Sequence, residues 1–372
     1  MMGPISRADT SLLGRWWWSV DRLTLLGLAI LLGIGYVLAL AAMPNASAHL
    51  SDPHTIAMIK QIFFLMVSGL TMLGMSMLGL RQVKLAALGM GIVFFLLTGF
   101  TLVHGTEVDG ANRWLDLPGF TVQPSEFLRP AFIIITGWLI AESRRTPGFP
   151  GKRAAAGVYL LTALVLKMQP DIGMTFLFTM VVLAQFYLDG MDMKWLGIAA
   201  VLVVLALVYA FFFITHVHTR VMMFIDPTKG SQAQTALMAF GNGGMWGLGP
   251  GEGQVKHFLP DARADFVFAV AGEEFGLFFC AFIILVFAAI VVRALFRLLA
   301  ESNLFVVLAG GGLIVGFGLQ AFVNMASSLS LIPTKGMTLP FLSYGGSSAM
   351  AVAIQMGFLL ALTRKRHAGE GG

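Results

Sequence analysis

The chain has 372 residues, of which 57% are hydrophobic and only 12% are charged. A globular core of this length could not bury so much apolar side chain, so the composition excludes an ordinary water-soluble domain and indicates a protein dissolved in lipid. The formal charge of +5 does not indicate nucleic-acid binding, because the basic residues are scattered through short segments instead of forming a stripe with interleaved aromatic residues.

Ten apolar segments follow one another along the chain. A helix needs about 20 mostly apolar residues to cross a bilayer, and long unbroken apolar runs predict helices where alternating ten-residue runs would predict barrel strands. The predicted spans are residues 23–43, 56–79, 83–103, 125–141, 154–167, 172–188, 195–214, 275–296, 304–327 and 343–363. We therefore expect an all-α integral membrane protein with ten transmembrane helices in a single domain, residues 23–363.

The distribution of basic residues predicts the orientation. Ten spans place both termini on one side, and with that side cytoplasmic, 15 of the 24 Lys and Arg residues lie inside. Four of the other nine lie in one long loop that the positive-inside rule does not weigh. We expect a cytoplasmic segment 1–22, followed by the stretch 23–43 as an uncleaved anchor. We also expect a cytoplasmic tail 364–372 and outer loops at 44–55, 104–123, 215–274 and 328–342.

Two outer features stand out before any family is considered. The span 154–167 is short and is followed at once by Gln169, Pro170 and Asp171, which predicts two helices meeting at a polar break below the outer surface. The long loop carries seven glycines between residues 241 and 253. Such a loop either brings backbone N–H groups close to a phosphate or is simply a mobile loop.

Asp265 lies between apolar residues at the mouth of a span. Loss of hydration there favours the protonated carboxyl group and makes the carboxylate a better proton acceptor, which suits a general base. The alternative is that Asp265 only caps the following helix. His216 and His218 are two positions apart and do not share a helix face, so we predict no metal site from them.

Several motifs together resemble the SEDS family (shape, elongation, division and sporulation), which is typified by RodA and FtsW. They are residues 112–115 (NRWL), 123–126 (QPSE), 169–173 (QPDIG), 272–276 (GEEFG), 333–340 (PTKGMTLP) and 343–348 (SYGGSS), with the Gly-rich loop leading to Asp265. The last stretch is more similar to FtsW than to RodA, whose counterpart usually lacks the Thr-Lys pair.

The resemblance implies ten transmembrane helices and a peptidoglycan glycosyltransferase that polymerises lipid II at the periplasmic face of the bacterial inner membrane. It implies as partners lipid II, a class B penicillin-binding protein transpeptidase of the FtsI type, division proteins of the FtsQ, FtsL and FtsB type, and membrane lipid. The family's essential acid falls on Asp265, and its other motifs contain Arg113, Gln123, Glu126, Asp171, Lys335 and Ser343.

The expected reaction is an inverting glycosyl transfer with Asp265 as general base. Cations must meet the departing pyrophosphate, and the candidates are Arg113, Arg129, Arg220 and Lys335. A divalent cation such as Mg²⁺ would serve the same purpose, although no ligand set is evident. The chain departs from the family pattern at Arg263-Ala264, where His-Thr is common, and at Arg129, where Lys is common; both departures concern loop geometry more than activity.

Three alternatives stay open. A RodA-like polymerase would act in elongation instead of division. A lipid II flippase or transporter would use the break at residues 169–171, because interrupted helices mark transporter sites. A non-catalytic scaffold would present its loops to division proteins, with the basic cytoplasmic residues binding those proteins or anionic lipid.

Overall fold

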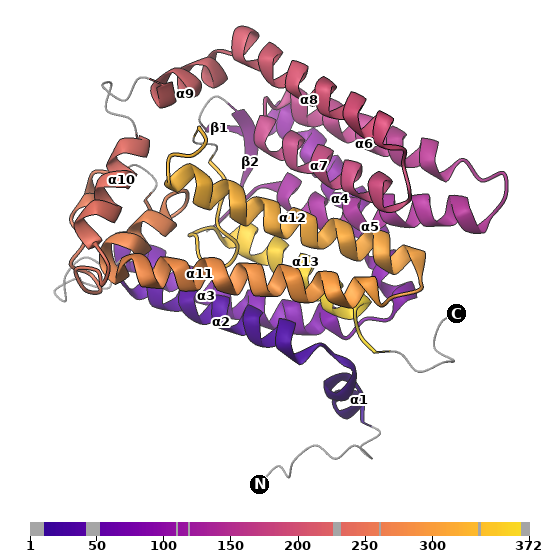
Figure 1. Cartoon of the computed structure of the whole chain (residues 1–372), viewed down its shortest axis with the longest axis horizontal. Coiled ribbons are helices and arrows are strands. Elements are labelled where there is room, and N and C mark those ends of the chain that lie inside the picture. Colours follow the sequence, from indigo (N-terminus) through magenta and orange to yellow (C-terminus); the bar gives the residue numbers. More distant parts are fainter. Residues whose placement is uncertain are drawn as a thin grey trace.

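Each of the ten predicted spans corresponds to a helix in the computed structural model (Figure 1), which describes residues 11–41, 53–108, 111–117, 120–225, 232–259, 262–333 and 336–365. The ten helices are α2 (Arg22–Ala41), α3 (Pro53–Ser76), α4 (Leu80–His104), α5 (Pro124–Arg145), α6 (Gly151–Met168), α7 (Ile172–Leu188), α8 (Met193–Phe213), α11 (Val267–Leu299), α12 (Leu304–Ser328) and α13 (Gly346–Leu362).

The helical membrane fold that the composition predicts is confirmed. Helices α2, α3, α4, α8, α11 and α12 are long and apolar enough to cross a membrane. Helices α7 and α13 are apolar but have 17 residues each, and α5 and α6 carry more polar residues along their length. The number of ten spans therefore stays a prediction.

The predicted loop 104–123 contains a small sheet that the sequence did not indicate. Strands β1 (Thr106–Val108), β2 (Ala111–Leu117) and β3 (Phe120–Val122) form an antiparallel sheet in the order β1-β2-β3. Strands β1 and β3 have only three residues each, and β2 (ANRWLDL) does not alternate between apolar and polar residues, so no periodicity of two is visible. The sheet positions Arg113 of β2 beside the beginning of α5.

The predicted long loop 215–274 is also largely helical. It contains α9 (Thr215–Ile225), α10 (Gln232–Gly243) and the 3₁₀ turn η2 (Val255–His257), and α11 begins at Val267, eight residues before the predicted span. Within α11, Gly276 has a non-helical backbone with φ 81° and ψ 179°, so the helix is broken there. The first part of α11 thus belongs to the outer region of the molecule.

Packing divides the helices into central and peripheral ones. Most residues of α12 and all but the first and one other of α13 are buried, and Figure 1 shows both between the other helices. On α8, by contrast, Ala210 is the buried residue, and large apolar side chains such as Val204 and Leu205 are exposed. Such a surface would be costly in water and is appropriate for contact with lipid.

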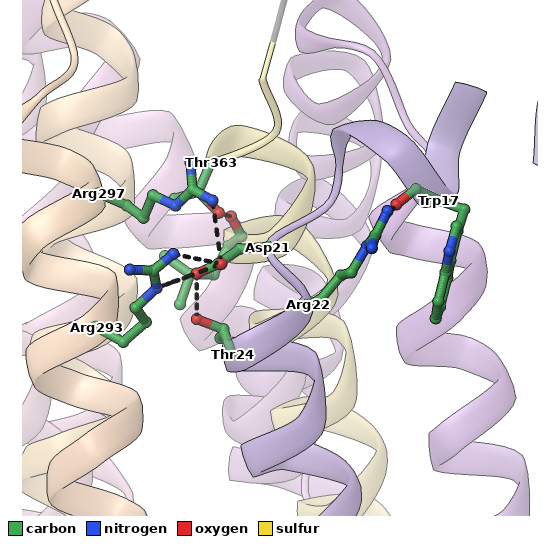
Figure 2. A network of polar contacts seen from close by, with 8 residues as sticks. Trp17, Asp21, Arg22, Thr24, Arg293, Arg297 and Thr363 are labelled. Carbon is green, nitrogen blue, oxygen red and sulfur yellow. Dashed lines mark hydrogen bonds and ion pairs between the residues drawn. The ribbon is translucent and has the colours of Figure 1, made fainter. Parts of the chain in front are cut away.

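A buried ionic cluster closes the end of the bundle where α2 begins and α11 ends (Figure 2). The Asp21 carboxylate accepts hydrogen bonds from Arg293 Nη2 at 3.0 Å and Arg297 Nη2 at 3.1 Å and from Thr24 Oγ1 at 2.8 Å. Burial by itself would raise the pKa of Asp21, but these hydrogen bonds outweigh it and hold the pKa below its ordinary value. The short helix α1 (Leu12–Ser19) is attached at the same end.

Candidate functional site

A polar cavity of about 170 Å³ lies at the end of the bundle that carries the sheet. Its walls come from β2, the first turns of α5, α7 and α13, one side of α12, and the segments that precede α11 and α13. The side chains that can hydrogen-bond or ionise there are Arg113, Trp114, Gln123, Glu126, Arg129, Asp171, Asp265, Gln320, Thr338, Tyr344, Ser347 and Ser348. Six of the nine site residues predicted from the sequence therefore meet around one cavity.

Asp171 lies at the predicted break between two helices. α6 ends at Met168 and α7 begins at Ile172, with Asp171 as the N-cap whose Oδ1 accepts from Met174 N at 3.1 Å. Its other oxygen accepts from Gln123 Nε2 at 3.2 Å, and Arg113 Nη1 lies 3.8 Å from Oδ1. The polar break predicted from the sequence is confirmed, and its carboxylate positions both Gln123 and Arg113.

Glu126 and Arg129 lie on the first turns of α5 and both are buried. Ser347 Oγ at the start of α13 donates to Glu126 Oε2 at 2.8 Å, which joins the two helices beside the cavity. The Arg129 side chain is 2% exposed, and its Nε has no hydrogen-bond partner within the described residues. A buried guanidinium that lines a cavity without a full set of acceptors is a site for an anionic group.

Three hydrogen bonds to consecutive backbone carbonyls hold the segment that carries Asp265. Tyr344 N donates to Arg263 O at 2.8 Å, Ser343 Oγ donates to Ala264 O, and Asn324 Nδ2 donates to Asp265 O at 2.9 Å. The N-cap of α11 is Phe266, with no side-chain cap, so the alternative role of Asp265 as a helix cap is wrong. Its side chain lines the cavity.

Two predicted site residues within the described ranges, Ser343 and Arg220, are not in the cavity wall. The Ser343 hydroxyl also accepts from Leu339 N at 2.7 Å, so it joins two backbone segments beside the cavity. Arg220, on α9, lies outside the wall but close to it: a Cβ placed on Gly336, which lines the cavity, would be 3.9 Å from Arg220 Nη1. Lys335 lies outside the described residues.

The Gly-rich loop packs against the start of α11 and contributes no residue to the described cavity wall. Gly247 has φ 83°, and a Cβ there would overlap the carbonyl group of Glu274. Two buried carboxylates fix the loop: Glu273 Oε1 accepts from Val255 N at 2.9 Å, and Glu274 Oε1 accepts from Lys256 Nζ at 2.6 Å. The glycines and the GEEFG motif therefore serve loop packing, and nothing in their placement favours a phosphate cradle.

Sequence reasoning missed two polar residues of α12. Gln320 Nε2 donates to Thr338 O at 2.9 Å, and Asn324 Nδ2 donates to Met337 O at 2.5 Å. Both side chains lie in an apolar helix at an i, i+4 spacing, so they share one face. That spacing, unusual in a lipid-embedded helix, is the signal that could have identified them.

The acids in the cavity do not form a metal site. Asp171 and Glu126 already accept hydrogen bonds from protein groups, and the described residues contain no cluster of three or more His, Cys, Asp or Glu side chains arranged to hold a metal ion. The donor set thus does not fit a resident divalent cation.

Comparison with known families identifies the architecture. The model of the FtsW/RodA/SpoVE family, described as cell cycle proteins, matches residues 22–368. The chain belongs to this family. Among its relatives, a protein of Caulobacter vibrioides named probable peptidoglycan glycosyltransferase FtsW is 39% identical over 98% of this chain and 95% of its own length. A protein of the same name from Geobacter metallireducens is 34% identical over 74% of this chain and 76% of its own length.

Two solved structures have the same fold. A chain from a peptidoglycan synthase complex, described in terms of coordinated polymerization and crosslinking, superposes with a TM-score of 0.74 at 23% identity, over 93% of this chain and 98% of its own. The rod shape determining protein RodA of Thermus thermophilus superposes with a TM-score of 0.70 at 23% identity, over 93% of this chain and 97% of its own.

Proposed function

We propose that this family member is a peptidoglycan glycosyltransferase that polymerises lipid II at the periplasmic membrane face during cell division. The observation that carries the proposal is the cavity that Asp265 shares with Arg113 and Arg129 at one end of a membrane-embedded bundle. Relatives named as peptidoglycan glycosyltransferases of the FtsW type support this chemistry. A lipid-linked donor also explains why the site lies in a membrane protein.

In the proposed reaction Asp265 acts as the general base. It takes the proton from the 4-hydroxyl group of the acceptor GlcNAc, whose oxygen attacks the anomeric carbon of the donor MurNAc. The new C–O bond forms as the bond to the lipid pyrophosphate breaks, with inversion, and the electron pair leaves with the pyrophosphate. The other two cavity acids have structural roles: Asp171 caps α7 and binds Gln123, and Glu126 joins α5 to Ser347 of α13.

Two arginines in the cavity wall stabilise the negative charge of the pyrophosphate leaving group. Arg129 is buried with an unsatisfied Nε, and Arg113 is oriented by Asp171. Fixed cations of this kind stabilise the charge that develops in the transition state. Arg220 and Lys335 are further candidates for the part of the substrate beyond the cavity, and Gln123 holds the Asp171 carboxylate.

Polymerisation of labelled lipid II by the purified chain tests this function. Replacement Asp265→Asn removes the base but keeps the side-chain shape, so we expect loss of glycan product with an unchanged unfolding temperature. The matched control is Asp116→Asn, which removes an exposed carboxylate on β2 outside the cavity wall and should keep polymerisation. If Asp265→Asn still forms polymer, the assignment of Asp265 as the general base is refuted. The same assay with a chelator added shows whether a divalent cation contributes.

The orientation is tested separately by thiol labelling. A Cys280→Ala background removes the single native cysteine, and a cysteine at Glu252, exposed in the Gly-rich loop, should react with a membrane-impermeant maleimide added outside intact spheroplasts. A cysteine at the exposed Arg153, at the other end of the bundle, should react only after lysis. The reverse pattern would place the cavity on the cytoplasmic side and exclude lipid II polymerisation at the periplasmic face.

We also propose a transpeptidase partner and a role in cell division. The solved synthase complex, in which polymerization and crosslinking are coordinated, supports a class B transpeptidase partner of the FtsI type, and the FtsW relatives support a place among division proteins at the septum. Depletion should therefore produce filaments that fail to divide. Rounding of rod-shaped cells would instead favour an elongation role of the RodA type.

The helix break at Asp171 favours a second candidate function, transport of the lipid. Interrupted helices with a polar break often form transporter sites, and α6 and α7 meet at such a break. Reconstituted vesicles separate the two functions: movement of lipid II across the bilayer without chain formation would favour transport, whereas polymer formed without movement favours the glycosyltransferase.

A further inference from the structure

A second cavity, of about 330 Å³, lies at the opposite end of the bundle from the candidate site. Helix α5 connects the two, because Glu126 on its first turn lines the first cavity and Arg145 at its last residue lines the second. Nineteen residues of helix span roughly 30 Å, about the thickness of the hydrocarbon core. The second cavity therefore opens at the other membrane surface.

Three cations surround this cavity: Arg81 and Lys84 on α4, and Arg145 on α5. None of the three makes an ion pair or a side-chain hydrogen bond with a residue of the described ranges, whereas cations nearby on the same face do. Arg144 Nε lies 3.0 Å from Asp189 Oδ1, and the Asp21 cluster holds two further arginines.

The wall supplies little to neutralise these charges. Its single carboxylate, Glu142, accepts a hydrogen bond from Thr146 at 2.8 Å. Lys84 Nζ is 4.5 Å from the ring centroid of Phe305 and 5.7 Å from that of Trp138, so aromatic faces provide part of its stabilisation. The cavity keeps a net positive charge and room for an anionic group.

The surroundings favour a lipid over a soluble anion. A tryptophan beside basic residues is the pattern of the membrane interface, the level at which lipid phosphates lie. Two exposed leucines continue along α4 from Lys84. Leu88 lies one turn further on the same face, and Leu85, the residue after Lys84, is 59% exposed. An acyl chain could therefore follow α4 directly from a headgroup held in the cavity.

We propose that this cavity binds the phosphate headgroup of an anionic phospholipid in the leaflet at its own membrane face. Arg81, Lys84 and Arg145 would bind the phosphate oxygens, Trp138 and Phe305 would enclose the glycerol region, and the acyl chains would lie along α4. The site is independent of the proposed glycosyl transfer, since it shares no residue with the first cavity.

Native mass spectrometry of the full chain in neutral detergent tests the proposal. Titration uses phosphatidylglycerol, phosphatidylcholine and inorganic phosphate as separate probes, and we expect preferential retention of phosphatidylglycerol. Lys84→Gln should weaken that binding at least about fivefold, and Arg81→Gln with Arg145→Gln should weaken it further. The matched control Arg153→Gln removes an exposed cation at the same face outside the cavity and should bind as the unchanged chain does.

Because misfolding of a variant could also cause loss of lipid binding, a second variant is chosen that should gain binding. Glu142→Gln removes the negative charge from the wall but keeps an acceptor for Thr146, so it should tighten phosphatidylglycerol binding. Equal retention of phosphatidylcholine would overturn the proposal, as would equal weakening by Arg153→Gln, no tightening by Glu142→Gln, or displacement of the lipid by inorganic phosphate at equal concentration. The last result would indicate a site for free anions.

Discussion

Arg129 is a charged residue whose burial the fold alone does not explain. It is 2% exposed, its Nε lacks a hydrogen-bond partner among the described residues, and it lines the candidate cavity. The Glu126 carboxylate on the same helix offsets part of its charge, but a buried charge with unfilled hydrogen-bonding capacity still costs stability. A ligand pyrophosphate would supply the missing acceptors, which gives this residue a functional reason for its position.

We expect Arg129→Gln to lower the rate of lipid II polymerisation about 10²-fold, the usual effect of removing one fixed donor to a developing charge. The unfolding temperature should not fall, because the substitution removes an incompletely satisfied buried cation. Arg129→Lys keeps the charge but loses the planar guanidinium group. Its polymerisation rate should lie between those of the unchanged chain and Arg129→Gln. Parallel loss of activity and thermal stability would show instead that Arg129 mainly supports the fold.

Asn324 is a positioning residue for Asp265. Its amide joins Asp265 O at 2.9 Å and Met337 O at 2.5 Å, so Asn324→Ala releases both segments. We expect kcat to fall about tenfold with little change in KM, because a fixed acid geometry matters more for reaction than for binding. Ser328→Ala, which removes a buried hydrogen bond to Asn324 O one turn away, should leave kcat nearly unchanged. Equal effects of the two variants would indicate a general packing role.

The family motifs predicted Glu126, Asp171 and Asp265 at the site, but single-sequence reasoning could not identify Asn324. Its partner Asp265 is 59 positions away, and the hydrogen bond exists only because α12 packs beside the segment preceding α11. The substrate-binding role of Ser343 stays a prediction, because a hydroxyl in a motif near a site can bind substrate or backbone; in the structure it binds two backbone groups.

At the scale of elements, the Gly-rich loop shows why the glycines are needed. Gly247 has φ 83° and its Cα hydrogens face the Glu274 carbonyl, whereas Gly244 has φ 54° with open space around it. Alanine substitution at these two glycines therefore separates the cost of a left-handed backbone from the cost of steric overlap. The left-handed backbone alone is expected to lower the free energy of unfolding by about 1 kcal/mol.

We therefore expect Gly247→Ala to lower the unfolding temperature in detergent markedly, and its matched control Gly244→Ala to lower it only slightly. Overlap with a backbone carbonyl cannot be relieved by a side-chain rotation, so the loop must separate from α11. Differential scanning fluorimetry of the two purified variants measures the effect. Equal shifts would mean that the loop does not pack tightly against α11.

The elements themselves were largely predictable where their signal is long and apolar. All ten spans are helices, because a continuous apolar run leaves few other ways to satisfy the backbone in lipid. The sheet β1-β2-β3 and the early start of α11 were not predicted. Short strands carry no readable period, and the first turns of α11 pack on α10 instead of lipid, so their polar residues looked like a loop.

At the scale of the whole molecule, the Asp21 cluster couples the beginning of α2 to the end of α11 (Figure 2). Because the pKa of Asp21 in the folded protein lies below its ordinary value, its contribution to stability is fully present above that ordinary value. It is lost as the pH falls through the lower, folded pKa. Protonation would then release two arginines from their carboxylate.

The prediction is a step in the unfolding temperature below about pH 4 that Asp21→Asn abolishes, with a lower unfolding temperature for this variant at neutral pH. The difference between the two pH curves isolates Asp21 from the other carboxylates. Asp192→Asn, at an exposed position on the same face, should reproduce the unchanged curve. A step that persists in Asp21→Asn would assign the acid transition to other groups.

The three carbonyl hydrogen bonds at residues 263–265 have a mechanical consequence. With its backbone tethered to two other segments, Asp265 can reposition its carboxylate only by rotating two side-chain bonds, which sweeps a small arc. A stationary acid cannot follow a lengthening product. After every sugar transfer the glycan itself would have to advance through the cavity by one disaccharide, so translocation of the strand becomes a step that the protein must accommodate in each cycle.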